Sequence, residues 1–277
     1  MGTISFDFGG DAVLVTGAAR GLGRDIALGF ARAGAKVAVN DLDGRDLGEG
    51  VPYATASGDD LDETVRLLTD AGAADVLRLP GDMTDETTVA AMVDATVERF
   101  GRLDVLVNNA GVISGGRCWE LTEAQWDAVV DVDLKAPFLC SKHAARHMTG
   151  RDGGGRIVTI CSTSGLVGIP GQVHYQSAKH GIVGQVKTLA LELAPHDVTV
   201  NAVCPTVVSS PMLDHLMEVG QAYFQEVSRL CGASTIFPGV DHIEPPDVTA
   251  AVQWLASDAA RYVTGISLPV DGGFTCK

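Results

Sequence analysis

Short apolar segments alternate along the chain with longer segments in which apolar residues recur every three or four positions. The short segments are typical of buried strands, and the long ones of helices with one buried face. The expected strands are 12–16, 36–40, 75–79, 103–107, 156–161, 198–203 and 266–270. The expected helices are 22–33, 61–71, 89–100 and 174–193. Because strands that alternate with helices are joined by right-handed crossovers, the pattern predicts an α/β fold with a parallel sheet covered on both faces.

Residues 1–277 are predicted to form one domain, since neither an internal repeat nor a low-complexity linker divides them. Two segments fit the alternation poorly: residues 43–58 are polar and rich in glycine, and residues 209–244 contain only short helical stretches. Long loops inside compact α/β domains are often functional. We therefore expect 43–58 to be an insert after the second strand, with a disordered surface loop as the alternative, and 209–244 to be a substrate lid.

Composition narrows the class of partner. Hydrophobic residues are 46% and charged residues 20%, which supplies a large core and is too little charge for a disordered chain. Lys and Arg number 20 against 35 Asp and Glu, a net charge of −15. Such a chain repels phosphate backbones and anionic lipid, so we expect neither nucleic acid nor a membrane as the main partner. A small anionic cofactor is still compatible, because backbone dipoles can bind one locally.

The ends and the cysteines favour a cytoplasmic location. The first residues contain no basic segment followed by an apolar core, so we expect no signal peptide. The charge-free stretch 157–173 is too short and too interrupted by glycine and proline to span a bilayer. The six cysteines are scattered without CxxC spacing, which argues against a zinc knuckle or a disulfide scaffold and fits a reduced compartment.

A glycine-rich turn joins the first strand to the first helix. Gly17, Gly21 and Gly23 let the backbone turn sharply and approach a pyrophosphate, toward which the N–H groups at the start of the helix would point. A tight turn without a ligand is the alternative, since a glycine-rich run alone is weak evidence.

Asp41 ends the second strand, 20 residues after Gly21. In dinucleotide-binding folds a carboxylate at this place holds the adenosine ribose, and it would repel a 2′-phosphate. Asp41 therefore favours NAD over NADP, with an ordinary turn aspartate as the alternative. Arg20 is a mild counter-argument, because an arginine near the ribose could accept a phosphate.

A serine, a tyrosine and a lysine form a second candidate site. Ser162 ends the fifth strand, while Tyr175 and Lys179 are four residues apart and share one helix face. A tyrosine with an ordinary pKa of about 10 is a poor base at neutral pH, but an ammonium and an oxidised nicotinamide would stabilise the phenolate and lower that pKa. The Ser162 hydroxyl would hold a substrate oxygen. Tyrosine and lysine at this spacing are also common on exposed helices, which is the alternative.

The chain resembles the short-chain dehydrogenase/reductase family over nearly its full length. The matching motifs are Thr16-Gly17-xxx-Gly21-x-Gly23, Asp82, Asn108-Asn109-Ala110-Gly111, Ser162, Tyr175-xxx-Lys179 and Pro205-xxxxx-Pro211-Met212. The resemblance implies a Rossmann-type, doubly wound sheet of about seven strands and a homotetramer. It also implies proton transfer through Tyr175, substrate orientation by Ser162, and a Lys179 that binds the nicotinamide ribose.

The resemblance and the spacing together give a set of residues for the NAD cleft. They are Gly17, Arg20, Gly21, Leu22, Gly23, Asp41, Leu42, Asp82, Met83, Asn109, Ala110, Gly111, Tyr175, Lys179, Pro205, Thr206, Val208, Ser210 and Met212. In the family, residues at the positions of Asp82 and Met83 contact adenine, and those at Val208 and Ser210 hold the carboxamide.

A closer resemblance is to the mycofactocin-coupled group, which includes carveol dehydrogenase-like enzymes. It rests on segments 51–56, 60–65, 201–206, 210–212, 244–248, 261–265 and 268–271. Members have a longer connection after the second strand and tend to hold NAD without exchanging it. The resemblance therefore implies a mycofactocin-type redox carrier as a partner that reoxidises the cofactor in place.

Two positions depart from the family pattern. Asp133 stands where the family often has an asparagine that holds a water of the proton relay, and Thr206 stands where glycine commonly follows Pro205. An ionised Asp133 near Lys179 would favour the ammonium but partly cancel its field at the tyrosine. We place Asp133 among the catalytic residues and expect Thr206 to narrow the nicotinamide end of the cleft.

No metal site is expected. His143 and His147 have i,i+4 spacing, but a surface or interface role is favoured because no further ligand is near in the sequence. The function expected is an NAD-dependent dehydrogenase of a lipophilic, terpenoid-like secondary alcohol, or the reverse reduction of the ketone. An enzyme that exchanges NAD(H) freely and a non-catalytic NAD-binding protein are the alternatives.

Overall fold

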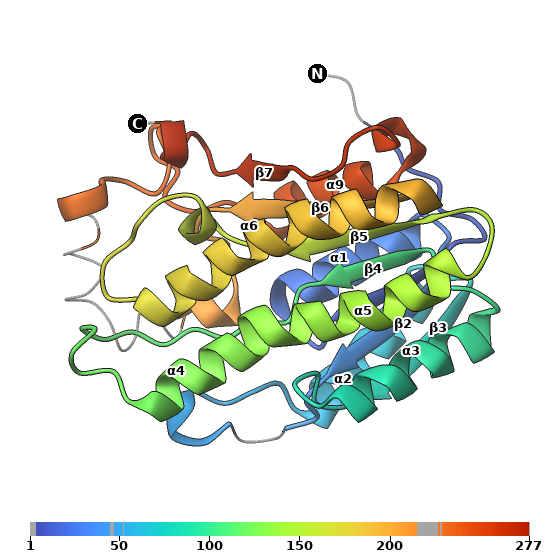
Figure 1. The fold of residues 1–277 in the computed structure, drawn as a ribbon, viewed down its shortest axis with the longest axis horizontal. Helices are drawn as coiled ribbons and strands as arrows, with labels where there is room; N and C mark the ends of the chain where they lie inside the picture. The colour runs from blue at the N-terminus through green and yellow to red at the C-terminus, as the bar shows by residue number, and fades with distance from the viewer. Residues whose placement is uncertain (1–3, 45–46, 52, 215–226, 228, 277) are drawn as a thin grey trace.

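One parallel sheet runs through the computed structural model, which describes residues 4–44, 47–51, 53–214, 227 and 229–276. Within these residues seven strands are ordered β3-β2-β1-β4-β5-β6-β7 (Figure 1). They are β1 Ala12–Thr16, β2 Lys36–Asp41, β3 Asp75–Pro80, β4 Val105–Asn108, β5 Gly155–Ile160, β6 Val198–Pro205 and β7 Ser267–Val270. The strand order reverses direction at β1 and β4, so a crevice is expected at their carboxyl ends.

Helices cover both faces of the sheet (Figure 1). They are α1 Gly21–Arg32, α2 Gly58–Asp70, α3 Glu86–Phe100, α4 Glu123–Val130, α5 Ala136–Thr149, α6 Val173–Leu193 and α9 Pro245–Ala256. Buried side chains of α3, α5 and α6 form one core cluster, and those of α1, α2 and α9 form the other. Along β1, Leu14 joins the first cluster while Val13 and Val15 join the second. Strands buried on both faces explain the unbroken apolar runs in the sequence.

The predicted doubly wound sheet of seven strands is confirmed. The fourth strand begins at Val105 rather than at Leu103, because the Leu103 N–H donates to His147 Nε2 at 3.1 Å instead of to a neighbouring strand. Helices α4, α5 and α9 had no predicted range. Between α4 and α5 lies a π-helical turn, Asp131–Lys135, which joins the two helices into one continuous rod (Figure 1).

The 3-10 turn of the insert, Gly48–Gly50, packs against α4; positions 45, 46 and 52 lie outside the described residues. Val51 is buried, and a short 3-10 turn, Gly48–Gly50, precedes it. A Cβ on Gly50 would lie 2.4 Å from the Cβ of Ala128, so this contact admits no side chain. Of the expected substrate lid, residues 209–244, positions 215–226 and 228 lie outside the described residues.

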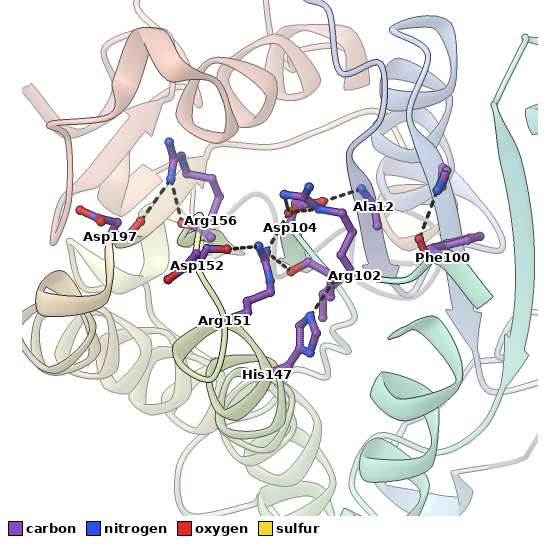
Figure 2. Close-up of polar contacts among 12 residues, drawn as sticks. Ala12, Phe100, Arg102, Asp104, His147, Arg151, Asp152, Arg156 and Asp197 are labelled. Atoms are coloured by element: carbon purple, nitrogen blue, oxygen red, sulfur yellow. Dashed lines mark hydrogen bonds and ion pairs between the residues drawn. The ribbon is translucent and has the colours of Figure 1, made fainter. Parts of the chain in front are cut away.

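The amino edge of the sheet is closed by a charged network around Asp104 (Figure 2). Its carboxylate accepts hydrogen bonds from the Ala12 N–H at 2.9 Å, Arg102 Nε at 2.8 Å and Arg151 Nη2 at 2.7 Å. These contacts connect the start of β1 with the segments before β4 and after α5. Among the described residues, no helix is both long and apolar enough to cross a membrane.

Candidate active site

The glycine turn between β1 and α1 has the backbone shape that the sequence predicts. Gly17 and Gly21 have φ of 64° and 56°, in the left-handed region that favours glycine. A Cβ on Gly23 would lie 2.1 Å from the Gly17 carbonyl oxygen. Asn109 Nδ2 donates to the carbonyls of Thr16 and Gly17 at 2.9 and 3.0 Å and fixes the turn from the side of β4.

The N-terminus of α1 opens onto this turn without a capping side chain or a first-turn acid. Its first N–H groups and the positive end of the helix dipole are therefore available to an anion. A pyrophosphate fits this cradle, because the turn is built to bring backbone, and no side chain, close to the ligand.

Asp41 is the last residue of β2, beside the turn. Its carboxylate accepts the N–H groups of Ala19 and Leu42 at 2.9 and 2.8 Å. Burial raises the pKa of Asp41, while these two N–H groups and Arg20 oppose that rise. Arg20 itself donates to the carbonyl of Ala54 in the insert at 2.7 Å. Arg20, the counter-argument to NAD in the sequence, is thus bound to the insert.

Asp82 and Met83, the pair expected to contact adenine, have different surroundings in the structure. The Asp82 carboxylate accepts the N–H and the hydroxyl of Thr84 at 2.8 and 2.7 Å, which shapes the loop after β3. The Met83 side chain is buried and belongs to the core cluster on the α3 face. Its side chain therefore serves the core in this structure.

Residues after β6 return to the glycine turn. Val208 forms a bridge with Ile243, and a Cβ on Gly21 would lie 3.3 Å from Pro211 Cδ. The Thr206 hydroxyl donates to the carbonyl of Ser234 at 2.8 Å. This bond connects the end of β6 to the second half of the expected lid, residues 209–244. The cofactor-site candidates of β1, β2, β4 and β6 thus lie along the same carboxyl edge.

The serine, tyrosine and lysine come together at that edge. Ser162 follows β5, and its Oγ accepts the Ser164 N–H at 3.1 Å. Lys179 Nζ lies 5.3 Å from the ring centroid of Tyr175 on α6. The Ser162 hydroxyl lies near the Tyr175 phenol and lowers its pKa.

Asp133 joins this group from the π-helical turn. Its Oδ2 lies 3.1 Å from Lys179 Nζ, and its Oδ1 accepts the Val112 N–H at 2.8 Å. Lys179 also donates to the carbonyl of Ile160 at 3.3 Å. Asp133 has no exposed surface, and Lys179 is 4% exposed. A π-turn inserts one extra residue into a helix and often marks a functional site. Here the turn carries Asp133, whose carboxylate contacts Lys179.

The charges of this group act against one another. Burial opposes the charge of Lys179, but Asp133 and Tyr175 raise the pKa of the lysine above its ordinary value, so it is an ammonium at neutral pH. Burial raises the pKa of Asp133, against the effect of Lys179. Burial also raises the pKa of Tyr175; Lys179 and Ser162 lower it, and Asp133 raises it further. The sequence predicts a lowered tyrosine pKa, whereas in the chain alone burial outweighs the lysine.

Tyr53 is a site residue that the sequence did not single out. Its phenol oxygen accepts the Ile113 N–H at 3.0 Å, and its ring belongs to a small cluster with Val51, Val112 and Tyr175. Burial raises the pKa of Tyr53, so it is a neutral phenol at physiological pH. The sequence indicates this region only through segment 51–56, one of the segments on which the closer resemblance rests, and assigns Tyr53 no role.

The two histidines of α5 do not face a common ligand. His143 Nε2 lies 3.2 Å from Glu86 Oε1, whereas His147 Nε2 accepts the Leu103 N–H. The His147 ring nitrogen is therefore used in holding the start of β4.

Known proteins are similar to this chain in both sequence and fold. Residues 17–275 match the family model described as Enoyl-(Acyl carrier protein) reductase. The (-)-trans-carveol dehydrogenase of Rhodococcus erythropolis is 35% identical over 275 residues, 97% of this chain and 98% of that protein. The crystal structure of carveol dehydrogenase from Mycobacterium avium in complex with NAD has a TM-score of 0.88 at 34% identity, covering 98% of this chain and 100% of that one. A short chain dehydrogenase from Mycobacterium paratuberculosis bound to NAD has a TM-score of 0.91 at 34% identity, with the same coverage. The expected resemblance is confirmed: the chain belongs to the short-chain dehydrogenase/reductase family.

Proposed function

We propose that the protein is an NAD-dependent oxidoreductase that interconverts a secondary alcohol and its ketone. The observation that carries the proposal is the group formed by the half-buried Ser162 and Tyr175 with the buried Lys179 and Asp133, at the same carboxyl edge as the glycine turn. NAD, when bound, supplies the hydride acceptor or donor. Relatives of similar length whose names describe a carveol dehydrogenase and NAD complexes support the assignment.

Each residue of the group has a distinct role. Tyr175 takes the hydroxyl proton in oxidation and returns it in reduction, and Ser162 holds the substrate oxygen beside the phenol. Lys179 keeps a positive charge next to Tyr175 and stabilises the phenolate. Asp133 holds Lys179 in place and keeps it protonated. A wild-type protein that binds NAD but turns over no alcohol or ketone would support the alternative of a non-catalytic NAD-binding protein.

NAD rather than NADP is supported by the edge of β2. The Asp41 carboxylate is fixed by two backbone N–H groups at the place where a ribose would lie. The nearby Arg20 guanidinium is held by the Ala54 carbonyl. A 2′-phosphate would meet the carboxylate with a like charge, so we expect NADP to be a poor cofactor.

The substrate we propose is a lipophilic secondary alcohol of terpenoid type. The apolar residues of the loops at this edge are Val112, Ile113, Leu166, Val167, Ile169, Met212, Leu213 and Ile236. A panel of cyclic terpenoid alcohols, sugars and acyl thioesters tests the class, with NADH formation or consumption as the readout. A preference for sugars or thioesters would overturn it.

We also propose that NAD is held without ready exchange, by the insert. The insert is attached near the phosphate turn, where Arg20 donates to Ala54, and near Tyr175, where Tyr53 accepts the Ile113 N–H. These two attachments, made by the neighbouring residues Tyr53 and Ala54, support an insert that is fixed at this point beside the cofactor cleft. A mycofactocin-type carrier would then reoxidise the bound cofactor in place.

Nucleotide release distinguishes this from an enzyme that exchanges NAD(H) freely. We expect purified protein to release NAD when it is unfolded. We expect Tyr53→Phe, which removes the phenol oxygen that accepts the Ile113 N–H, to release it faster in the folded state. The matched control is Tyr262→Phe, since Tyr262 is 89% exposed. Purified protein without nucleotide, or equal release from both variants, would favour free exchange.

A homotetramer is proposed from the family resemblance and from the exposed apolar side chains on α4 and α5. Trp126 is 40% exposed and Phe138 is 44% exposed. Sedimentation at several concentrations tests the assembly, and a species that remains monomeric would overturn it.

A further inference from the structure

Gln176 follows Tyr175 on α6 and reaches the loop that connects β5 to α6. With its amide nitrogen toward the loop, it donates to the carbonyls of Ser164 and Val167, both at 2.8 Å. Its amide oxygen accepts the Ile169 N–H at 3.1 Å and the Ser164 hydroxyl at 3.3 Å. Both donors and both acceptor positions of the amide are therefore in use.

The loop is attached to α6 at two places, and the Gln176 amide is one of them. A Cβ on Gly165 would lie 2.8 Å from the Lys179 carbonyl oxygen, so the turn after Ser162 packs directly on the helix. Gln176 holds the following residues, 167 to 169, to the same helix three residues before Lys179. A fully satisfied network of this kind keeps a loop in a single conformation.

The loop connects with the reacting groups at its start. Ser164, whose carbonyl and hydroxyl both contact Gln176, donates its N–H to Ser162 Oγ at 3.1 Å. That bond occupies an acceptor position of Ser162 and leaves its O–H free to donate. The side chains of Val167 and Ile169, which are half-buried, lie on the stretch that the amide holds.

We propose that Gln176 is a positioning residue that sets substrate specificity. It fixes residues 163–169 relative to the Tyr175 phenol and so determines how the carbon skeleton of the alcohol lies against the proton acceptor. The inference rests on the proposed function, since it concerns the alcohol handled by that same site.

The test compares Gln176→Met, which keeps the length and removes all four hydrogen bonds, with Ser177→Ala. Ser177 is the next residue on the helix, and its exposed hydroxyl bonds only within α6, to the Val173 carbonyl at 2.7 Å. Steady-state kinetics with the preferred alcohol, NAD affinity and deuterium uptake by residues 163–169 are measured for wild type and both variants. Gln176→Glu keeps the acceptor oxygens and loses the donors, and it takes the place of the methionine variant if that does not fold.

In Gln176→Met we expect KM for the alcohol to rise about tenfold, with kcat changed by less than about threefold. NAD affinity should stay at the wild-type value, and residues 163–169 should take up deuterium faster. Gln176→Glu should change KM in the same direction, because its carboxylate repels the two loop carbonyls, and Ser177→Ala should match wild type. An unchanged KM in an active enzyme would overturn this inference alone, as would a parallel fall in kcat and NAD affinity. A wild type that turns over no alcohol would overturn the proposed function first.

Discussion

Asp104 at the amino edge of the sheet and Asp133 at the carboxyl edge are both buried next to basic side chains, yet their surroundings differ. Asp104 accepts from Arg102, from Arg151 and from the Ala12 N–H. Asp133 accepts one backbone N–H and faces a single lysine. Arg151 also donates to the Leu103 carbonyl, so the amino-edge network joins segments of the chain to one another, whereas the charge of Asp133 raises the pKa of Tyr175.

The charged groups at the amino edge stabilise the fold, whereas those at the carboxyl edge shift the protonation of one another. In the amino-edge network one carboxylate accepts from a backbone N–H and from two arginines, and these bonds hold the strand starts together (Figure 2). At the carboxyl edge, charges are buried with few partners, so each one shifts the protonation of its neighbours. We therefore expect substitutions at the amino edge to change stability and those at the carboxyl edge to change activity.

The largest effect on activity is expected for Tyr175→Phe. Removal of the phenol oxygen takes away the proton acceptor and should lower kcat by about 10³-fold. The ring remains, so the melting temperature and NAD binding should stay close to wild type. Stopped-flow measurement of NADH formation checks the rate, and a loss below about tenfold would show that another group carries the proton.

Asp104→Ala should have the largest effect on stability. It leaves the Ala12 N–H buried without its acceptor and two arginines without their carboxylate, at an expected cost of about 2–3 kcal/mol in the free energy of unfolding. Urea unfolding measures this, with kcat expected to stay at the wild-type value. Asp152→Ala is the nearby control, because Asp152 contacts Arg151 through its backbone carbonyl. A fall in kcat at full folding would break the separation of the two edges.

Most of the fold was predictable because strands buried on both faces give unbroken apolar runs. The helices at 123–149 were not delimited, for physical reasons. Val129 is the one buried residue of α4, so its apolar period is weak. A π-turn then shifts the helical phase, and Pro137 near the start of α5 resembles a helix breaker.

The candidate site was predictable where its geometry is local. Tyr175 and Lys179 are one helical turn apart, and Gly17, Gly21 and Gly23 belong to one turn. The contact of Tyr53 with Ile113 spans 60 positions and leaves no periodic signal. Three of the four Gln176 contacts are with backbone groups of a loop, which any loop sequence supplies.

A smaller effect is expected for Asp133→Asn, which sharpens the comparison at the carboxyl edge. The amide keeps the shape of the carboxylate and removes a charge that raises the pKa of Tyr175. Activity near neutral pH should stay the same or rise by up to about threefold. The measurement is kcat/KM with the preferred alcohol, with Asp131→Asn as control on the same turn, since Asp131 pairs with the surface Lys135 at 3.5 Å. A large loss of turnover in Asp133→Asn alone would contradict this prediction.

The pH dependence of hydride transfer is the most direct test, since the proposed proton transfer depends on the ionisation of Tyr175. In single-turnover oxidation of the preferred alcohol, the rate should rise with pH as the phenol loses its proton. In Asp133→Asn the rise should move to lower pH, because the removed carboxylate raises the pKa of Tyr175. A profile that stays in place or moves to higher pH would contradict the claim that Asp133 and Lys179 together set the protonation of this tyrosine.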